Sequence, residues 1–580
     1  MQSLLLTLFE FPFSFGSADA LELAVGVLLA ALLFAAPWAE RFARRLAARP
    51  RASFAILAAL PILLRLALLP HHPIPHPSIR DDFGHLLMAD TLLHARFANP
   101  PHRWHDFFET TFVLQQPTYS SIYPLGQGCV LALGRLFFHT PWAGVLLESG
   151  ALAALCYWML RAWTSPLAAL AGGVLAVFTL GPLNEWTNTY SGGALSAIAG
   201  CLVFGSLPRL EGERPKLHAL LLGAGVALQM LTRPYECVLM VVALALYFVP
   251  VLRRPSHVRK LIPLTGLAIS AALPALLLTA LQNRAVTGSF TTLPYALSQY
   301  QYGVPAALTF QSNPLPHRLL TPQQQLEYKS QRAFHGDAPD TIKNFLLRLE
   351  YRVRFYRFYF FVPLYFAIAA FVWTARSFRR AYVLAACAVF ALGVNFFPYF
   401  YPRYVAAVAC FFVLVSVAGL RSLNSLVIRN QPVGRRAAIF LLALCAAQFL
   451  FWYALHVFDD QEVSIALKQY ESWDAINHLD SGERESIERQ LAQTPGPKLI
   501  FVSYWPNHLF QHEWVYNSAD IDASQVVWAR DLGALRNQDL IRYYPNRGVW
   551  LVEPDAQPPR LARYPRPSPP SVPWPFQDVP

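Results

Sequence analysis

The chain has few charged residues and few cysteines for its length. Lys, Arg, Asp and Glu make up 14% of its 580 residues, whereas soluble domains carry roughly 25%, so an ordinary soluble enzyme is excluded. The seven cysteines fall in or beside apolar segments and form no CxxC pair, so neither a disulfide framework nor a zinc framework is expected. No Lys or Arg precedes Arg41, so the basic region of a cleavable signal peptide is missing, and we expect the first apolar segment to be retained.

What the chain does have is hydrophobic sequence. Hydrophobic residues make up 55% of it, and the mean hydropathy is +0.33. Apolar runs of close to the roughly 20 residues that a spanning helix needs recur along most of the length. We predict about twelve membrane helices. They lie near residues 21–38, 52–69, 141–160, 165–182, 191–208, 217–231, 236–252, 261–281, 358–375, 381–398, 404–420 and 437–457.

Basic clusters between the apolar runs predict the orientation of these helices. The clusters are Arg41–Arg51, Arg209–Lys216, Arg253–Lys260, Arg376–Arg380 and Arg421–Arg436. The positive-inside rule places them in the cytoplasm and explains the net charge of +12, and no nucleic-acid motif is present, so no nucleic-acid partner is expected. This pattern is consistent only if Leu125–Phe138 does not cross the membrane. We interpret that segment as a half-inserted or surface helix; the alternative is an ordinary short span with a different topology.

The predicted fold is an all-α polytopic transmembrane bundle of about 12–13 helices with a small C-terminal α/β domain on the external side. In the tail, a helical stretch (Ile465–Leu491) precedes predicted strands at 498–503, 526–529 and 548–552. The predicted domains are an N-terminal extra span with a cytoplasmic basic loop (1–51), a transmembrane domain (52–457) with external loops 70–124 and 282–357, an external α/β domain (458–553), and a Pro-rich, poorly ordered tail (554–580).

The first external loop carries the most informative residues. Asp81 and Asp82 follow a predicted span directly, and Gln116 to Gly128 contains the sequence Tyr123-Pro124-Leu125. Two adjacent carboxylates raise the pKa of at least one of them, and partial burial at the membrane boundary makes a carboxylate a better proton acceptor. The alternative is a solvated turn or helix cap.

This loop resembles the first external loop of the GT-C superfamily of membrane glycosyltransferases, which includes the protein O-mannosyltransferases and the lipid A aminoarabinose transferase. In that superfamily an acidic pair, often Asp-Glu, follows the first span, and a Tyr-Pro-Pro or His-Pro-Pro element precedes the next helix. The matching residues are Asp81-Asp82 and Tyr123-Pro124, with Asp82 in place of Glu and Leu125 in place of the second Pro. A weaker resemblance in helical pattern runs over roughly 52–457.

The resemblance implies a GT-C-like enzyme that transfers a sugar from a polyprenyl phosphate carrier to an acceptor on the external face of the bacterial inner membrane. The acceptor is an unidentified glycan, lipid or protein. Because no nucleotide sugar is available outside the cytoplasm, such an enzyme needs a donor that travels in the membrane. It also needs a base for the acceptor hydroxyl and cations for the phosphate. A transporter or flippase of lipid-linked sugars and an O-antigen-ligase-like enzyme are the alternatives.

The predicted site combines these residue types. It consists of Asp81 and Asp82 as catalytic carboxylates; Arg233, Arg403, Tyr404, Arg352 and Arg357 for the donor phosphate; and His85, Tyr123, Asn184, Asn188, Tyr190, Tyr235 and Glu236 for substrate contacts. The arginines could instead snorkel to the interface or attract lipid generally. Seven histidines fall between His71 and His105, but none has HExxH spacing, so no metal or other cofactor is predicted, although a divalent metal stays possible.

Overall fold

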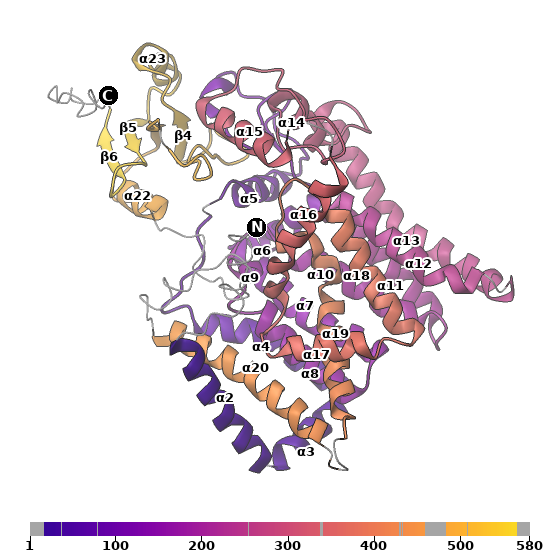
Figure 1. Ribbon diagram of the computed structural model, residues 1–580. Helices are drawn as coiled ribbons and strands as arrows, with labels where there is room; N and C mark the ends of the chain where they lie inside the picture. Colours follow the sequence, from indigo (N-terminus) through magenta and orange to yellow (C-terminus); the bar gives the residue numbers. More distant parts are fainter. Residues whose placement is uncertain are drawn as a thin grey trace.

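The segments predicted as membrane spans are helices that pack side by side, and the segments predicted as external lie together at one end of this bundle (Figure 1). The computed structural model describes residues 17–35, 37–77, 79–252, 255–336, 340–427, 431, 433–458, 483–506 and 508–564. The predicted fold class, an all-α membrane bundle with a small C-terminal α/β unit, is confirmed.

The bundle is formed by helices that follow the apolar runs of the sequence. They are α2 (Ser17–Ala35), α3 (Pro37–Ala47), α4 (Pro50–Ala67), α7 (Trp142–Trp163), α8 (Pro166–Leu180), α10 (Ala194–Ser206), α11 (Pro215–Thr232), α12 (Pro234–Leu252), α13 (Pro255–Thr287), α17 (Leu364–Trp373), α18 (Phe378–Val394), α19 (Ala409–Asn424) and α20 (Val433–Phe458). Each of the twelve predicted segments is represented among them. Several helices begin with a proline, whose fixed φ and missing N–H suit the first turn.

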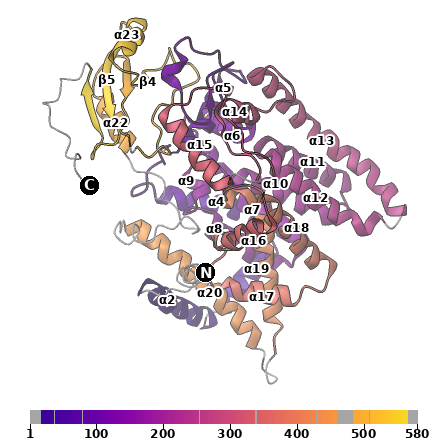
Figure 2. The same ribbon diagram turned by 45° about the horizontal axis from the view of Figure 1, so that its top comes forward.

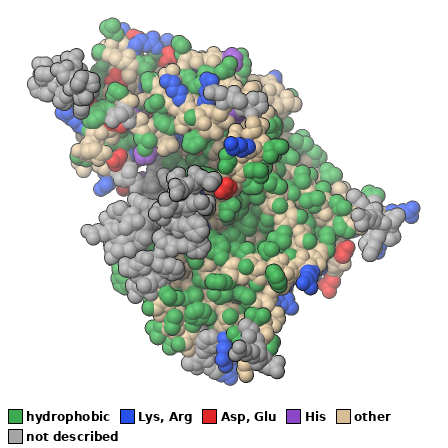
Figure 3. Space-filling model, in the orientation of Figure 1, with side chains coloured by type: hydrophobic (Ala, Val, Ile, Leu, Met, Phe, Trp, Pro, Cys, Tyr) green, Lys and Arg blue, Asp and Glu red, His purple; other side chains and the backbone are tan. Residues whose placement is uncertain are grey.

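The lengths of these helices fit a protein that crosses the membrane several times. Within the described residues, five helical segments are long and apolar enough to span, and a bent pair, Ile342–Tyr359 with Leu364–Trp373, would make a sixth. Further apolar helices of 10–17 residues complete the bundle. On the face seen in Figure 3, hydrophobic side chains make up much of the surface of the bundle, while Lys and Arg lie at its lower end and at the right-hand tip where α12 meets α13.

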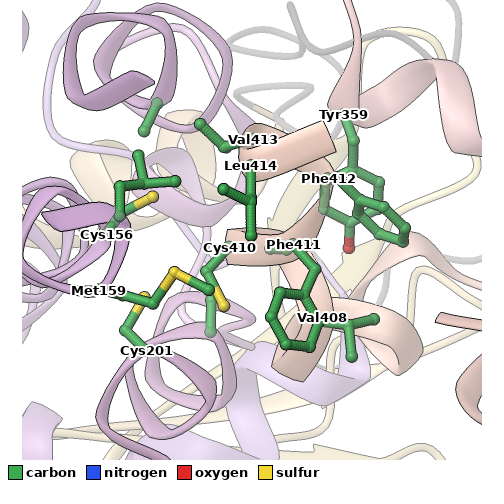
Figure 4. Close-up of a cluster of buried hydrophobic side chains, with 14 of the residues drawn as sticks. Cys156, Met159, Cys201, Tyr359, Val408, Cys410, Phe411, Phe412, Val413 and Leu414 are labelled. Carbon is green, nitrogen blue, oxygen red and sulfur yellow. The ribbon is translucent and has the colours of Figure 1, made fainter. Parts of the chain in front are cut away.

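Small residues allow the bundle helices to approach each other closely. A methyl group at Gly200 of α10 would come within 1.7 Å of the Ala407 carbonyl oxygen, so only glycine fits there. Nearby, the thiols of Cys156, Cys201 and Cys410 meet in a buried cluster formed by α7, α10 and α19 (Figure 4). All seven cysteines are free. The sulfur atoms here fill space between close helices.

Between the bundle and the C-terminal unit lies a layer of shorter elements. It contains α5 (Arg80–Leu93), η1 (His105–Phe108), β1 (Val113–Leu114), β2 (Ser120–Ser121), α6 (Leu125–Phe138), α9 (Glu185–Asn188), α14 (Pro294–Tyr302), α15 (Pro322–His335), α16 (Ile342–Arg352), η3 (Val353–Tyr359) and η4 (Pro402–Val408). This layer brings the two external loops of the sequence, which are more than 150 residues apart, into one assembly.

Helix α6 begins and ends on the same side of the bundle. At its start, a methyl group at Gly126 would lie 2.7 Å from the Thr232 hydroxyl, at the end of α11. Directly after it, the indole of Trp142 donates to the Thr187 carbonyl at 2.9 Å, in the loop between α8 and α10. This placement is the one that the charge pattern required of a segment that does not cross.

The C-terminal unit is a four-stranded sheet in the order β4-β3-β5-β6 with two flanking helices. These elements are α22 (Glu483–Ala492), β3 (Lys498–Val502), β4 (Val526–Arg530), α23 (Ala534–Tyr543), β5 (Gly548–Glu553) and β6 (Arg560–Arg563). Strand β3 pairs in parallel with β4 and β5, and β6 is antiparallel to β5. The predicted strands are confirmed; of the predicted helix, residues 465–482 lie outside the described residues.

The expectation that the chain is extended and poorly ordered from residue 554 is wrong for its first part. Strand β6 pairs with β5 in the register Leu551 to Ala562, because the connection at 554–559, which contains three prolines, reverses the chain between them. Residues 565–580 lie outside the described residues. Figures 1 and 2 place the unit beside α5 and α15. There the ring of Tyr516 stacks on Phe83 of α5 at 4.3 Å.

Candidate active site at one end of the bundle

Helix α5 places the two adjacent carboxylates in different surroundings. Ile79 is extended and precedes the helix, so Asp81 and Asp82 occupy its first turn, where the helix dipole favours negative charge. Consecutive helical residues point about 100° apart, so the two side chains cannot share one face. Asp82 is 1% exposed, whereas the side chain of Asp81 keeps 25% of its surface.

Asp82 is buried against the loop between α8 and α10. Its Oδ1 accepts the backbone N–H of Tyr190 at 2.9 Å. Burial raises the pKa of Asp82 to about 7; the Tyr190 bond opposes this rise and the charge of Asp81 adds to it. This carboxyl therefore holds its proton at a much higher pH than an ordinary Asp does.

The polar loop at 184–190 is held by its own amides. Asn184 caps α9 by accepting the Trp186 N–H at 2.9 Å. Asn188 donates to the Pro182 carbonyl at 3.0 Å and accepts from the buried Arg65 guanidinium at 2.7 Å. These contacts use both predicted sugar-binding amides to fix the loop that carries Tyr190.

Asp81 faces two side chains that the sequence predicted for the same site. The Tyr123 hydroxyl donates to its Oδ1, and Arg403 Nη1 lies 3.6 Å from its Oδ2. Gly84, one turn later, makes room for this tyrosine: a methyl group there would lie 2.6 Å from the Tyr123 ring. Burial by itself would raise the pKa of Asp81, but Arg403, Arg80 and the Tyr123 bond outweigh it and hold the pKa below its usual value. Asp81 is therefore ionised at neutral pH.

Arg403 is the centre of charge in this cluster. It lies in η4, after Tyr-Phe-Tyr-Pro, and its side chain is 8% exposed. Besides approaching Asp81, it donates to the Ser191 hydroxyl at 2.8 Å and lies 3.8 Å from the Glu185 carboxylate. Its guanidinium carbon is 4.9 Å from the Tyr401 ring. Two carboxylates therefore compensate one buried guanidinium.

A second cation, Arg233, occupies the short break between α11 and α12. It pairs with Glu236 at 3.3 Å and lies 5.3 Å from the Tyr404 ring. Both Arg233 and Arg403 act on His85: burial and the charges of the two guanidiniums together lower the pKa of His85 to about 3, against the pull of Asp81. His85 is thus neutral, its ring lies 4.3 Å from that of Tyr123, and its buried Nδ1 has no partner among the described residues.

The remaining predicted residues lie around this cluster in supporting positions. Tyr235 donates to the Gly393 carbonyl at 2.8 Å. Arg352 is 3% exposed and donates to the Val394 and Phe397 carbonyls at 3.0 and 2.6 Å, so its guanidinium fixes the chain after α18. Arg357 is half-buried in η3. Of the predicted phosphate ligands, the structure thus gathers Arg233, Arg403 and Tyr404 near the carboxylates.

Four further residues belong to the cluster that sequence reasoning missed: Arg80, Glu185, Ser191 and Tyr401. Each one adjoins a predicted residue or its motif, since Arg80 precedes Asp81 and Tyr401 belongs to the Tyr-Pro-Arg sequence that contains Arg403. That adjacency was the available signal. The partners of Arg80, Glu185 and Ser191, however, lie more than 200 residues away along the chain. Within the described parts of the chain, no three His, Cys, Asp or Glu side chains are grouped to hold a metal ion.

No protein-family model and no curated protein matches the chain. Among solved structures it is similar to ArnT from Cupriavidus metallidurans in the apo state, with 12% identity over 85% of this chain and 92% of that one and a TM-score of 0.48. It is also similar to the structure of ArnT from the same organism bound to undecaprenyl phosphate, with 12% identity over 86% of this chain and 92% of that one and a TM-score of 0.47. A third similar structure is the Archaeoglobus fulgidus oligosaccharyltransferase in complex with Zn and sulfate, with 13% identity over 86% of this chain and 67% of that one and a TM-score of 0.46.

Proposed function

We propose that the protein is a membrane glycosyltransferase that moves a sugar from a polyprenyl phosphate carrier to a hydroxyl acceptor on the external face of the inner membrane. The observation that carries the proposal is the 3.6 Å approach of Arg403 to Asp81. These residues are 322 positions apart, and they bring a cation suited to phosphate and an ionised carboxylate suited to proton transfer to one point.

The donor phosphate is assigned to Arg403 and Arg233. Both sit where bundle helices meet the external layer, which is the depth that a phosphate on a membrane-embedded carrier would occupy. Arginine holds phosphate through two parallel N–H bonds. A bound phosphate would compete with Asp81 and Glu185 for Arg403, so donor binding would leave Asp81 more basic than it is in the free protein.

Asp81 is assigned as the base. Its partly exposed carboxylate takes the proton of the acceptor hydroxyl while the oxygen bonds to the anomeric carbon. The bond from that carbon to the phosphate oxygen breaks, and its electron pair remains on the phosphate, where Arg403 and Arg233 stabilise the charge. Asp82 is less suited to this step because it is buried and already accepts the Tyr190 N–H.

His85 and Tyr123 are assigned to the substrate. The neutral imidazole of His85 has an unpartnered nitrogen next to Tyr123 and between the two arginines, so a sugar hydroxyl could bind it without displacing a protein contact. The side-chain amides of Asn184 and Asn188 form hydrogen bonds within the loop, so we assign them to holding the loop and not to binding the sugar. The acceptor is a glycolipid, polysaccharide or protein hydroxyl.

The transporter alternative would be expected to use paired broken helices. Among the described residues, a single pair of helical segments with a sharp bend between them is long and apolar enough to span the membrane; it is formed by Ile342–Tyr359 and Leu364–Trp373. A transporter also breaks no bond in the donor, so it would not need a base beside the phosphate-binding arginines. An O-antigen-ligase-like enzyme would be expected to act without an acidic pair in this loop.

The proposal is tested by turnover of a defined donor. The purified protein in nanodiscs should release free polyprenyl phosphate from a panel of polyprenyl-phosphate-linked sugars, and the Asp81→Asn variant should not. Asp106→Asn is the matched control, because Asp106 is a carboxylate of the same loop with 55% of its side chain exposed. Mass spectrometry of envelope glycans with and without the gene would identify the sugar. Wild-type protein that translocates donors without cleaving them would contradict the proposal.

A further inference from the structure

Arg80 precedes Asp81 in the chain, yet its guanidinium forms its ion pair with Glu327 of α15. The Glu327 side chain is 1% exposed, and its second oxygen accepts from the Gln331 amide. The Arg80 guanidinium lies over the Phe112 ring, 4.7 Å from its centroid. Arg80 is therefore held by a buried carboxylate and an aromatic face, away from the neighbouring Asp81.

Helix α15 fixes the position of Glu327 through a row of buried polar side chains. Gln323, Gln324, Glu327 and Gln331 are all at most 6% exposed and lie on one face of the helix. Gln323 accepts from Arg530 of the C-terminal sheet at 2.8 Å, and Gln324 donates to Glu109 of the first loop at 3.2 Å. The external layer and the C-terminal unit together determine where the Glu327 carboxylate lies.

The position of Arg80 matters because an arginine that paired fully with Asp81 would occupy its oxygens. Such a pair lowers the pKa of a carboxylate by about 1–3 units and blocks the lone pairs that a base must use. In the structure, Arg80 acts on Asp81 only as a nearby charge, and the Asp81 oxygens face Tyr123 and Arg403.

We propose that Glu327 is a positioning residue for glycosyl transfer, because it draws the Arg80 guanidinium onto Phe112 and so leaves the Asp81 carboxylate open to the acceptor hydroxyl. The inference rests on the proposed role of Asp81 as base. It adds a requirement that the function alone does not contain: the external helix α15 must be docked for the base to work.

The charged and titratable groups around Asp81 and Arg80 define what a pH experiment would report. They are Asp82 and His85 on α5, Tyr123 before α6, Glu185 on α9, Tyr401 and Arg403 at η4, and Glu327 on α15. A Glu327→Gln substitution changes one of them and keeps its shape. Loss of the Glu327 charge lowers the pKa of Asp81 in the same direction as a freed Arg80 does, so the double variant without Arg80 is needed to isolate the contribution of the guanidinium.

In Glu327→Gln, Arg80 is expected to turn to Asp81. The turnover number should fall about tenfold, the acid limb of its pH profile should move down by about one pH unit, and the donor KM should stay within about twofold. The double variant Arg80→Gln/Glu327→Gln should recover most of the turnover and the original acid limb, because neither charge remains.

Asp340→Asn is the matched control, since Asp340 is also a carboxylate with little exposed surface, 9% of its side chain, and it pairs with Arg348 away from α15 and Asp81. It should destabilise the protein without moving the acid limb. If Glu327→Gln does not fold, Glu327→Asp carries the test and should keep the wild-type limb.

Two results would overturn the inference: a wild-type pH profile in Glu327→Gln, or a double variant no more active than the single one. Absence of donor turnover in the wild-type protein would instead count against the proposed function itself.

Discussion

The backbone N–H of Tyr190 donates to Oδ1 of Asp82 across 2.9 Å, and this bond joins the first turn of α5 to the loop between α8 and α10. The carboxyl that accepts it is 1% exposed, and burial raises its pKa to about 7. Above that pH the folded protein holds a buried negative charge that an unfolded chain would leave in water. The buried charge of Asp82 therefore lowers the free energy of unfolding above that pH.

Asp82→Asn should for this reason stabilise the protein. A raised carboxyl pKa contributes stability that is complete below the unfolded pKa, near 3.8, and is lost as the pH rises toward 7. An amide keeps the Tyr190 bond and never ionises, so the gain should be largest at pH 8, at most about 4 kcal/mol, and should shrink toward pH 5. Thermal unfolding in detergent at pH 5 and 8 measures this. A melting temperature that falls at pH 8 would contradict it.

The neighbouring substitution Asp81→Asn should have the opposite effect on stability. The pKa of Asp81 is held below its usual value, so this group contributes stability at neutral pH that is lost as the pH falls through the folded pKa. The variant should also lose turnover by about 100-fold or more, the scale of a general base. Asp82→Asn should keep measurable turnover. Equal losses in the two variants would remove the assignment of Asp81 as base.

The fold could be predicted from the sequence because membrane helices are encoded locally. An apolar run near 20 residues and a basic flank are enough to identify a span and its direction, and α4, α7 and α20 lie within a few residues of their predicted positions. The charge pattern also predicts that α6 does not cross the membrane, because a full crossing there would invert the Arg253–Lys260 cluster.

The site could be predicted only in part, because its partners are set by tertiary contacts. Asp81, Tyr123 and Arg403 were recognisable by residue type and motif. Nothing in the local sequence indicates that Glu327 holds Arg80, or that Asn188 receives Arg65 and so has its amide occupied. Polar residues that bind a substrate and polar residues that fix a loop look alike until their partners are known.

Arg352 shows how that distinction can be measured. It donates to the Val394 and Phe397 carbonyls and to the Asn395 side chain, so Arg352→Ala should lower the free energy of unfolding by about 2–4 kcal/mol. Donor affinity per folded molecule should remain at the wild-type value. Melting temperature and binding of a labelled polyprenyl phosphate check the two parts. A stable variant with weak donor binding would return Arg352 to the phosphate site.

The orientation of the chain can be tested by cysteine labelling in a background without the native cysteines, since Cys129 is exposed. Ser120 and Thr187 are buried and would resist labelling, so exposed positions are needed. Cysteine at Thr291 and Ser518 should react with an impermeant maleimide in cells with a permeabilised outer membrane.

The cytoplasmic side of the membrane is tested by cysteines placed beside the basic clusters. Cysteine at Ser377 or Ser425, both exposed, should react only after the inner membrane is opened. Reaction at Ser377 in closed cells would invert the assigned topology and move the acidic pair to the cytoplasm.

Arg403 and Arg233 provide the most direct test of the donor site, since they approach His85 from separate elements, η4 and the break between α11 and α12. Replacing either by Ala removes a charge-assisted pair to phosphate, which should weaken donor binding about 10- to 100-fold and lower turnover. Lys should restore only part of the affinity, because it keeps the charge and loses the planar fork.

Arg318→Ala is the control for these variants. Arg318 is an external arginine with 21% of its side chain exposed, paired with Glu109 outside the cluster, and its loss should leave donor affinity unchanged. Arginines that only snorkel to the membrane interface would tolerate Lys fully, and Ala would then reduce expression more than specific activity. If both Ala variants bound the donor as tightly as the wild type, the phosphate would have to be assigned elsewhere. The next candidate would be the half-buried Arg357 of η3.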